Sequence, residues 1–387
     1  MKVIKLISKN VFRHKLRSIL TIFGIAIAVM AFGLLRTVVT AWNAGVDASS
    51  SNRLISRHAV SFIFPLPYSY RDQLQKIPGV TGVSFANWFQ GKYKDNSPDN
   101  FFARYAVDAE TFMELYPEYI LPNEQLATFK QQRNSCIVGK KIADKNNLKV
   151  GDIMTFEGDI YPGSYDFTVA GIYVGKDKTI DETQLFFHWS YLDERMKDVA
   201  GYGSGNVGWY IINIDDPKAS ASVSESIDAM YVNSTAKTKT ETEKAFQQSF
   251  VSLSSAILVS LEVISYVIIG IILLVLANTM IMSARERIRE YAVLKTLGFT
   301  GSTIAILIIG ESLAISIAGG AVGLALTFPL ANGFGNAFPT IFPVFQVLPS
   351  TILLMAGFAL LVGLAASVFP SWKSSRISIV EGLRQIG

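Results

Sequence analysis

The chain has 387 residues, of which 50% are hydrophobic, and its 35 Lys and Arg against 31 Asp and Glu give a net charge of +4. The single cysteine, Cys136, excludes an intramolecular disulfide framework and a multi-cysteine metal site. The three histidines are scattered without ligand spacing, so we expect no metal site. The positive excess flanks the apolar runs described next, where anionic lipid attracts it, and it needs no nucleic-acid partner.

The hydrophobic residues are concentrated in four long runs. Each run approaches or exceeds the roughly 20 residues that a helix needs to cross the apolar core of a bilayer. The runs are Leu16–Leu35, Val263–Met282, Thr303–Leu330 and Thr351–Pro370. The first run lacks an A-x-A-like end and follows an amphipathic stretch, so we interpret it as a retained anchor and not as a cleaved signal peptide.

The charges beside these runs predict their orientation. Residues 1–17, 283–302 and 371–387 together carry thirteen Lys and Arg, whereas the loop 331–350 carries none. Basic residues accumulate on the cytoplasmic side of a membrane. Both termini and the 283–302 loop are therefore predicted to be cytoplasmic, and the long segment between the first two runs to be external. We expect a multi-pass protein of the inner (cytoplasmic) membrane.

The predicted fold is membrane α-helical, with four transmembrane helices and a large external α+β domain between the first two. The predicted segments are a cytoplasmic amphipathic interfacial helix (1–15), the first membrane helix (16–36), the external domain with stalk ends (37–250), a stalk with the second membrane helix (251–282), a cytoplasmic helix (283–302), the third membrane helix (303–330), a short external loop (331–350), the fourth membrane helix (351–370) and a cytoplasmic tail (371–387).

The external segment mixes strands with helices. Residues 37–60 lack strong helix breakers, and we expect the first membrane helix to continue outward through them. A strand–helix–strand unit is predicted at Ser61–Pro65, Tyr70–Lys76 and Val80–Asn87. A β-rich unit is predicted from strands at Ser135–Val138, Ile153–Phe156, Tyr165–Val174 and Trp209–Asp215, with helices at Lys140–Asn146 and Ala219–Met230. Residues 237–262 are predicted to form one helix that leads into the second run.

A densely charged segment follows the second run. Within residues 278–299 a mixed apolar face lies beside a charged one, and Gly298 is suited to end a helix. The pattern predicts a short amphipathic helix along the inner membrane surface. From the residues alone two interpretations stay open: a basic anchor for anionic lipid, or a docking helix for a cytoplasmic partner.

Several fragments of the chain carry a family resemblance. In the charged segment the resembling positions are Asn278, Met280, Ser283, Arg285, Glu286, Arg287, Arg289, Glu290, Leu294, Lys295 and Gly298. Further fragments in the same order are Leu16–Thr21 with Gly24, Pro78–Val80, Val150–Asp152, Phe167–Ile172, Pro370–Lys373 and Ile379–Arg384. Together they resemble the MacB/FtsX-type ABC transporter permeases, also called type VII or mechanotransmission transporters.

The resemblance implies a permease subunit that forms a homodimer, or a pseudo-dimer with a related permease, on two copies of a separate cytoplasmic ABC ATPase. The ATPase-coupling residues that it implies are Arg285, Glu286, Arg287, Arg289, Glu290, Tyr291, Leu294 and Lys295. ATP-driven closure inside would move the MacB-like periplasmic domain, and efflux of an amphiphilic, peptide or lipid-linked substrate would start from the outer face. A periplasmic adaptor, an outer-membrane channel and membrane lipid are further partners that the family admits.

Two other functions fit the same family. One is an FtsX-like, non-transporting regulator of an external cell-wall hydrolase, and the other is a Lol-type permease that extracts lipoproteins. The external segment of about 215 residues, with a β-rich part, resembles the MacB and Lol side more than the smaller FtsX domain. We therefore take transport as the first hypothesis and keep both alternatives.

The chain itself is not expected to be an enzyme. It has no G-x-x-x-x-G-K-[ST] motif for phosphate binding, and in this it departs from MacB, which has a fused nucleotide-binding domain. We expect no cofactor in this chain, with ATP and Mg²⁺ bound by the partner ATPase.

A few polar and small residues near the runs are candidates for transmission and packing. Glu311 lies inside the third run, and an ionisable side chain at membrane depth is a functional candidate. We favour a structural role, as the partner of an Arg of the 283–302 loop or as a polar contact across a dimer. Gly319, Gly320 and Gly323 permit close helix packing within or between subunits. Glu262 is expected at the outer membrane interface.

Aromatic residues cluster at three places in the external segment. The clusters are Phe62, Phe64, Tyr68 and Tyr70; Trp88 and Phe89; and Phe186, Phe187 and Trp189. We interpret most of them as core or turn residues, and the alternative is that some line an apolar substrate groove.

Overall fold

The computed structural model describes residues 10–11, 13–95, 97, 100–197, 204–338 and 342–380. The chain divides into two compact units. The helical unit contains the residues up to Ala41, Ser255–Asn336 and those from Phe345 onward. The second unit, which we call the inserted domain, contains Trp42–Ser254 and Ala337–Val344. Most of the predicted interfacial helix (1–15) and the end of the predicted tail (381–387) lie outside the described residues.

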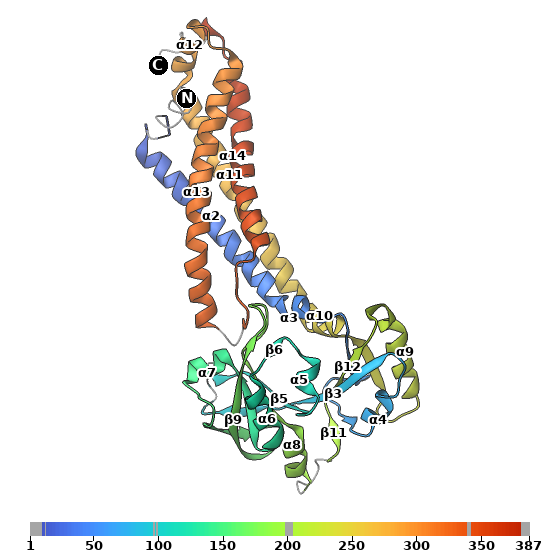
Figure 1. Cartoon of the computed structure of the whole chain (residues 1–387). Coiled ribbons are helices and arrows are strands. Elements are labelled where there is room, and N and C mark those ends of the chain that lie inside the picture. Colours follow the sequence, from blue (N-terminus) through green and yellow to red (C-terminus); the bar gives the residue numbers. More distant parts are fainter. Residues whose placement is uncertain are drawn as a thin grey trace. The chain divides into compact units, whose positions relative to one another are not determined.

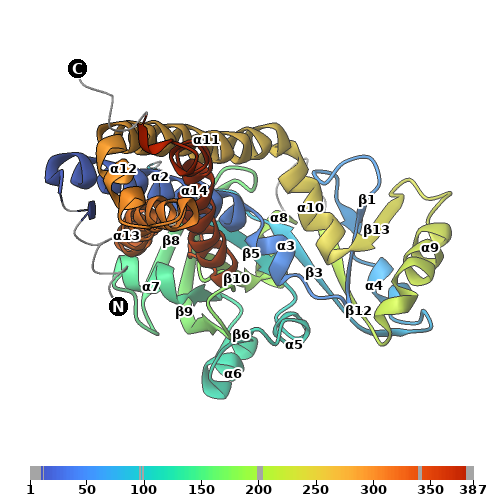
Figure 2. The same cartoon turned by 90° about the horizontal axis from the view of Figure 1, so that it is seen from above.

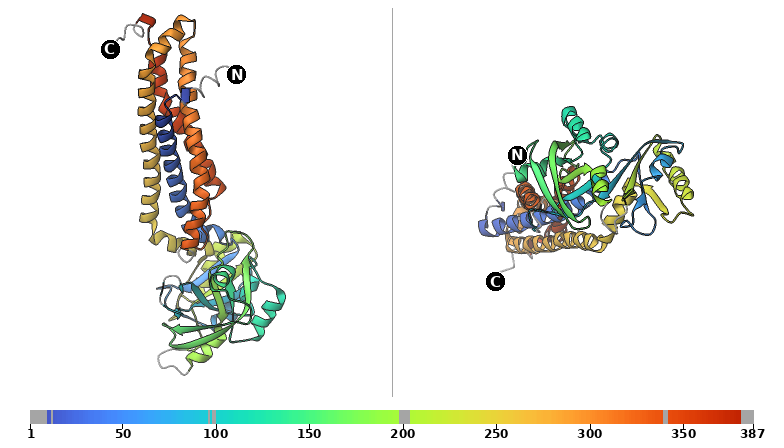
Figure 3. Two further views of the ribbon diagram at one scale, coloured as in Figure 1. Left: turned by 90° about the vertical axis from the view of Figure 1, so that its left-hand side faces the viewer. Right: turned by 90° about the horizontal axis from the view of Figure 1, so that it is seen from below.

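Four long helices build the helical unit (Figure 1), and they run side by side in a further view (Figure 3). They are α2 (Lys15–Trp42), α11 (Ser255–Glu286), α13 (Gly301–Ala337) and α14 (Pro349–Ser375). All four are long and apolar enough to cross a membrane, which confirms the predicted fold class. A short helix, α12 (Ile288–Thr296), lies between α11 and α13 in the chain.

Glycines allow the helices of this unit to approach closely. A Cβ atom added to Gly319 or Gly323 would lie 2.8 or 2.6 Å from a backbone oxygen of α2. A Cβ atom added to Gly320 would lie 2.5 Å from the Cβ atom of Ala359 on α14. Such distances are too short for any side chain. The small-residue face of α13 therefore packs within the subunit, against two different helices.

The inserted domain is built on eleven strands of one mixed sheet. The strands are β1 (Arg53–His58), β3 (Val80–Trp88), β4 (Gly91–Tyr93), β5 (Ala103–Val107), β6 (Tyr119–Ile120), β7 (Ser135–Gly139), β8 (Ile153–Gly158), β9 (Gly163–Gly175), β10 (Gln184–His188), β12 (Trp209–Ile214) and β13 (Thr238–Thr242). The order is β13-β1-β12-β3-β5-β10-β7-β9-β8-β4, and β6 pairs with β9 beside this path. The pairs β5–β10 and β7–β9 are parallel.

The β3–β5 pair joins the β13-β1-β12-β3 part of the sheet to the β5-β10-β7-β9-β8-β4 part. β12, which was predicted with the β-rich unit, belongs to the first part, because it pairs with β1 and β3. A separate two-stranded sheet pairs β2 (Leu66–Pro67) with β11 (Asn206–Val207). The helices are α3 (Ala44–Ala48), α4 (Tyr70–Leu74), α5 (Phe112–Leu115), α6 (Asn123–Gln131), α7 (Lys140–Asn146), α8 (Trp189–Met196), α9 (Ser220–Met230) and α10 (Glu243–Leu253), with a 3-10 turn at Pro217–Ala219. Seen from above, α4 and α9 lie with β1, β12 and β13, and α7 lies beside β8 and β9 at the other end (Figure 2).

Three local predictions for this domain were wrong. Ser61–Pro65 is irregular, and the first strand is β1, inside the segment that was expected to continue the membrane helix. Residues 237–262 are not one helix, because β13 pairs with β1 and α10 then ends at a break before α11. For residues 37–60 and 237–262, the pairing of β1 with β12 and β13, which lie far along the chain, outweighs the local pattern.

Aromatic side chains fill the core of the inserted domain. Phe89 and Phe187 belong to one buried cluster and Phe186 to another, while Phe64 is half exposed. Tyr68 stacks on Trp189 with ring centroids 4.9 Å apart. Most of the flagged aromatic residues are thus part of the packing, as predicted, and those that face a cavity are considered below.

Candidate functional site at the α12 end of the helical unit

The candidate site surrounds the turn between α11 and α12. Because α11 continues to Glu286, the predicted site residues Arg285 and Glu286 belong to the last turn of that long helix and not to the short one. Arg287 precedes the first residue of α12. Gly298 ends the segment with φ +89°, a left-handed conformation that glycine adopts without strain.

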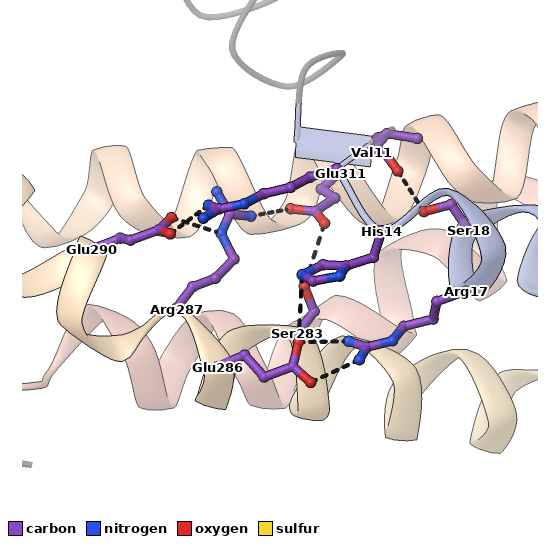
Figure 4. Close-up of polar contacts among 10 residues, drawn as sticks. Val11, His14, Arg17, Ser18, Ser283, Glu286, Arg287, Glu290 and Glu311 are labelled. Atoms are coloured by element: carbon purple, nitrogen blue, oxygen red, sulfur yellow. Dashed lines mark hydrogen bonds and ion pairs between the residues drawn. The ribbon is translucent and has the colours of Figure 1, made fainter. Parts of the chain in front are cut away.

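Arg287 is the centre of an ionic network (Figure 4). Its Nη1 donates to Glu311 Oε2 at 2.8 Å, and its Nε donates to Glu290 Oε2 at 3.2 Å. Ser283 Oγ donates to the other carboxylate oxygen of Glu311 at 3.4 Å. The side chains of Arg287 and Glu311 are only 10% and 8% exposed. This pair ties the α11–α12 turn to α13, and removing either partner would leave a buried charge uncompensated.

Two arginines, one just before α2 and one in its first turn, extend the network. Arg17 binds both carboxylate oxygens of Glu286 at 2.7 and 2.8 Å (Figure 4). Arg13 binds Glu290. Exposed ion pairs of this kind contribute at most about 1 kcal/mol each, so their main consequence is geometric. They bring α2, α11 and α12 together at one place. These two pairings could not be predicted from the sequence, since chain separations of 277 and 269 residues give no sign of pairing.

Burial and the network shift the pKa values of two α12 side chains. Burial raises the pKa of the Glu290 carboxyl, but hydrogen bonds from Arg13 and Arg287 outweigh burial and hold that pKa below its usual range. Burial raises the pKa of Tyr291 to about 12. The guanidinium of Arg287 lies 5.5 Å from the centre of the Tyr291 ring. At neutral pH, Glu290 is therefore charged and Tyr291 is neutral.

The other end of α12 is bound to the end of α14. Lys295 Nζ donates to the backbone oxygens of Ser375 at 2.9 Å and Ile377 at 2.6 Å. A lysine there satisfies carbonyl groups that a helix end leaves without partners. Leu294, also a predicted site residue, packs against the core of the helical unit. Both ends of α12 are thus held to the long helices.

The outward face of α12 is apolar and basic. Leu297 is 71% exposed, and Val293 and Phe299 are also exposed. Arg285 and Arg289 are exposed too, and the structure gives them no ion-pair partner among the residues that it describes. The sequence analysis did not name Val293, Leu297 or Phe299 as site residues. The i, i+4 spacing of residues 289, 293 and 297 was the available signal, since such residues share one helix face.

The remaining predicted residues lie away from this site. Glu262 accepts a hydrogen bond from Arg36 Nη1 of α2 at 2.8 Å, and it lies roughly 36 Å along α11 from Glu286 at 1.5 Å per residue. The three glycines of α13 lie at helix crossings, as described above. Among the described residues, no group of three or more His, Cys, Asp or Glu side chains could hold a metal ion.

Comparisons with known proteins identify the family. Residues 18–230 match the MacB-like periplasmic core domain, and residues 262–379 match the FtsX-like permease C-terminal domain. An uncharacterized ABC transporter permease of Methanocaldococcus jannaschii is 23% identical over 97% of this chain and 96% of its own length. The macrolide export ATP-binding/permease protein MacB of Bdellovibrio bacteriovorus is 30% identical over 34% of this chain, but over only 19% of its own length.

A solved structure also matches part of the chain. The crystal structure of the periplasmic region of MacB from Actinobacillus actinomycetemcomitans matches with 14% identity and a TM-score of 0.37, over 53% of this chain and 95% of that one. The first family match alone covers more than half of the residues, and the order of the two matches is that of the resembling fragments. The chain belongs to the MacB/FtsX-type family of ABC transporter permeases.

Proposed function

We propose that this permease couples ATP hydrolysis by a separate ATPase to movement of its inserted domain. That movement would drive export of an amphiphilic, peptide or lipid-linked substrate from the outer face of the inner membrane. The partner ATPase would bind ATP and Mg²⁺, in two copies under a permease dimer. The α12 end would face the cytoplasm, in agreement with the basic residues at that end.

The observation that carries this proposal is the combination of an exposed docking face with a firmly held helix. Leu297 and Val293 offer apolar contacts, and Arg289 offers a charge that no described residue neutralises. Apolar anchors and arginines are the residues that dominate protein–protein interfaces. Lys295 and Arg287 hold the opposite face of α12 to α14 and α13. A partner that moved α12 would therefore move the ends of the long helices with it.

Two helices offer a path from this site to the inserted domain along the chain. α2 is held at its start by Arg17 and leads into α3 of the inserted domain, and α11 is held at its end by Glu286 and follows α10 after Ser254 alone. A displacement at the α12 end would act on both helices. The same coupling would serve an FtsX-like regulator or a Lol-type permease, and the partner found outside distinguishes these from export.

The first test is to purify the full chain from its native membrane in mild detergent and to identify the co-purifying proteins by mass spectrometry. We expect a stoichiometric ABC ATPase. An adaptor or outer-membrane channel beside it would support export, and a cell-wall hydrolase would support the regulatory alternative. A preparation free of any ATPase would contradict the proposal.

The second test locates the contact. The double variant Leu297→Asp with Arg289→Glu should abolish ATPase binding, because it places like or unpaired charges in the interface. The matched control is Val232→Asp, which adds a charge at an exposed apolar position of the inserted domain. Arg287 is unsuitable for this test, since it is buried against Glu311. If the double variant retains the ATPase as well as the control does, α12 is not the docking helix.

A further inference from the structure

A cavity of about 390 Å³ lies within the inserted domain, between one face of the sheet and α10. Its size is within the range of cavities that hold small molecules. Strands β1, β12, β3, β5 and β10 form one wall, and residues of α5, β6 and α10 form the others. The cavity thus lies at the β3–β5 pair, where the two parts of the sheet meet.

Aromatic rings form most of the lining, with some pairs stacked and others steeply inclined. Tyr105 meets Trp88 at 76° with centroids 5.4 Å apart, and it meets Trp209 at 89° with centroids 5.9 Å apart. The ring of Phe62 packs beside that of Trp209, with centroids 4.9 Å apart. The face of an aromatic ring carries partial negative charge, and a cavity lined by several rings can therefore attract an organic cation.

A buried carboxylate gives the cavity a negative charge. Glu243 of α10 lines it, with a side chain only 7% exposed. Its Oε2 accepts from Arg53 Nε at 2.9 Å and from the backbone N–H of Ser50 at 2.8 Å. Its Oε1 has no hydrogen-bond partner among the described residues. Arg53 is shared with a second carboxylate, Glu118, so one cation stands against two anions.

We propose that this cavity binds an apolar organic cation, a quaternary ammonium or a tertiary amine with a ring or short chain. The cation would lie against the aromatic faces and near Glu243 Oε1, so that the excess negative charge is compensated. A neutral ligand would exclude water from that oxygen without replacing the hydrogen bonds that water donates to it, and burying an uncompensated carboxylate oxygen costs free energy. An anion would meet net negative charge. The inference goes beyond the proposed function, since binding here requires no ATPase.

The position of the site connects it to the second membrane helix along the chain. Glu243, Phe246 and Gln247 all belong to α10, and all three line the cavity. One residue, Ser254, separates α10 from α11. A bound cation would therefore contact the segment that leads into α11.

The test uses the full chain in nanodiscs of zwitterionic lipid and titration calorimetry with three probes of similar shape. They are benzyltrimethylammonium, its neutral carbon isostere neopentylbenzene, and the anion benzylsulfonate. We expect the cation to bind at least about tenfold more tightly than either other probe. Equal binding of the neutral probe, preference for the anion, or no binding of the cation would each overturn the proposal.

Two variants locate the bound cation. Glu243→Gln should weaken benzyltrimethylammonium binding at least about tenfold. The matched control is Glu241→Gln, two residues away on β13, which removes an ion pair with Arg57 but does not line the cavity. Gln247→Lys, at a partly exposed position of the lining, places a positive charge beside the proposed site and should abolish cation binding. This variant tests the location of the site if Glu243→Gln does not fold. Unchanged affinity in folded Gln247→Lys protein would overturn the proposed location.

Discussion

The two units of the chain each surround an arginine with two carboxylates and a tyrosine ring, but they enclose it differently. In the inserted domain, Arg53 lies between Glu118 and Glu243, 4.1 Å from the centre of the Tyr116 ring, with its side chain 4% exposed. In the helical unit, Arg287 has one buried partner, Glu311, and one partner, Glu290, that is 41% exposed. We call the first network closed, because its arginine and both carboxylates are largely buried. We call the second open, because Glu290 reaches solvent at the end where we propose that a partner docks.

The packing around these networks differs as well. The inserted domain fills its core with large rings, whereas the helical unit brings backbones together at glycines such as Gly319 and Gly323. A domain of interlocked rings and a closed ion network resists local change. In the helical unit, which has close helix crossings and an open network, whole helices can shift as rigid bodies more easily than elements of the inserted domain can. The following predictions test this contrast, beginning with the largest expected effect.

Removal of the enclosed arginine should be the most damaging change. Arg53→Ala leaves two carboxylates without their shared cation, and we expect a loss of about 3–5 kcal/mol in the free energy of unfolding of the inserted domain. Chemical denaturation followed by tryptophan fluorescence measures it. The matched control is Arg57→Ala on the same strand, which pairs with the less buried Glu241 and should cost about 1 kcal/mol. Equal losses in both variants would contradict the closed-network interpretation.

The open network should tolerate the same change better. Arg287→Ala leaves Glu311 buried and unpaired, while Glu290 keeps Arg13 and contact with solvent. We expect a loss of about 3 kcal/mol in the helical unit, and Glu311→Gln in the same chain should recover most of it, because the uncompensated charge is then gone. Thermal unfolding in detergent measures both variants. Arg289→Ala, an exposed control, should change stability by no more than about 0.5 kcal/mol. Failure of the second substitution to rescue the first would count against the ion pair as the cause.

The next largest loss of stability is expected where α13 approaches α2 closely at a glycine. A Cβ atom at Gly323 would lie 2.6 Å from the backbone oxygen of Ala26, so Gly323→Ala should separate α13 from α2 at a cost of about 1–3 kcal/mol. Gly333 lies on the same helix with no atom within 4 Å of the corresponding Cβ position. Gly333→Ala should therefore be neutral or stabilising by up to about 1 kcal/mol. Thermal unfolding of both variants under one condition separates the steric effect from helix propensity, and similar behaviour of the two would refute it.

Local signals predicted much of this fold, and long-range contacts explain the failures. Lys140–Asn146 has the same bounds as α7, because its helix is ended locally by Asn147 in the left-handed conformation. The first strand was misplaced because β1 depends on partners far along the chain: Leu54 pairs with Ile212 on one side and with Thr242 on the other. Side-chain alternation in a short segment does not contain that information.

The candidate site likewise contains residues that local sequence could predict and residues that it could not. Glu311 could be singled out because a carboxylate in an apolar run is conspicuous, and an arginine of the preceding loop was one of its two candidate partners. Arg13 and Arg17, the partners of Glu290 and Glu286, could not be predicted, since nothing local links residues so far apart. The cavity was still less visible, because its lining comes from α5, α10 and strands whose order only the folded sheet defines.

The smallest predicted effect is a pH dependence confined to the inserted domain. His188 is buried at the end of β10, and its Nε2–H donates to the backbone oxygen of Phe129 at 2.6 Å. Burial lowers the pKa of His188 below its ordinary value of 6.5. Below pH 6.5 the unfolded chain therefore binds a proton that the folded domain does not, and stability should fall by at most about 1.4 kcal/mol per pH unit until the folded pKa is reached.

Denaturation midpoints at pH 7.5 and 5.5 measure this effect, and His188→Gln should remove most of the difference between them. The helical unit provides the contrast, because the pKa of Glu290 is depressed and its contribution to stability is lost only below the ordinary carboxyl range. Glu290 should therefore contribute no change in melting temperature across the same interval. A parallel loss of stability in both units, or one that persists in His188→Gln, would show that the acid sensitivity arises elsewhere, and that the enclosed character of the inserted domain does not extend to this histidine.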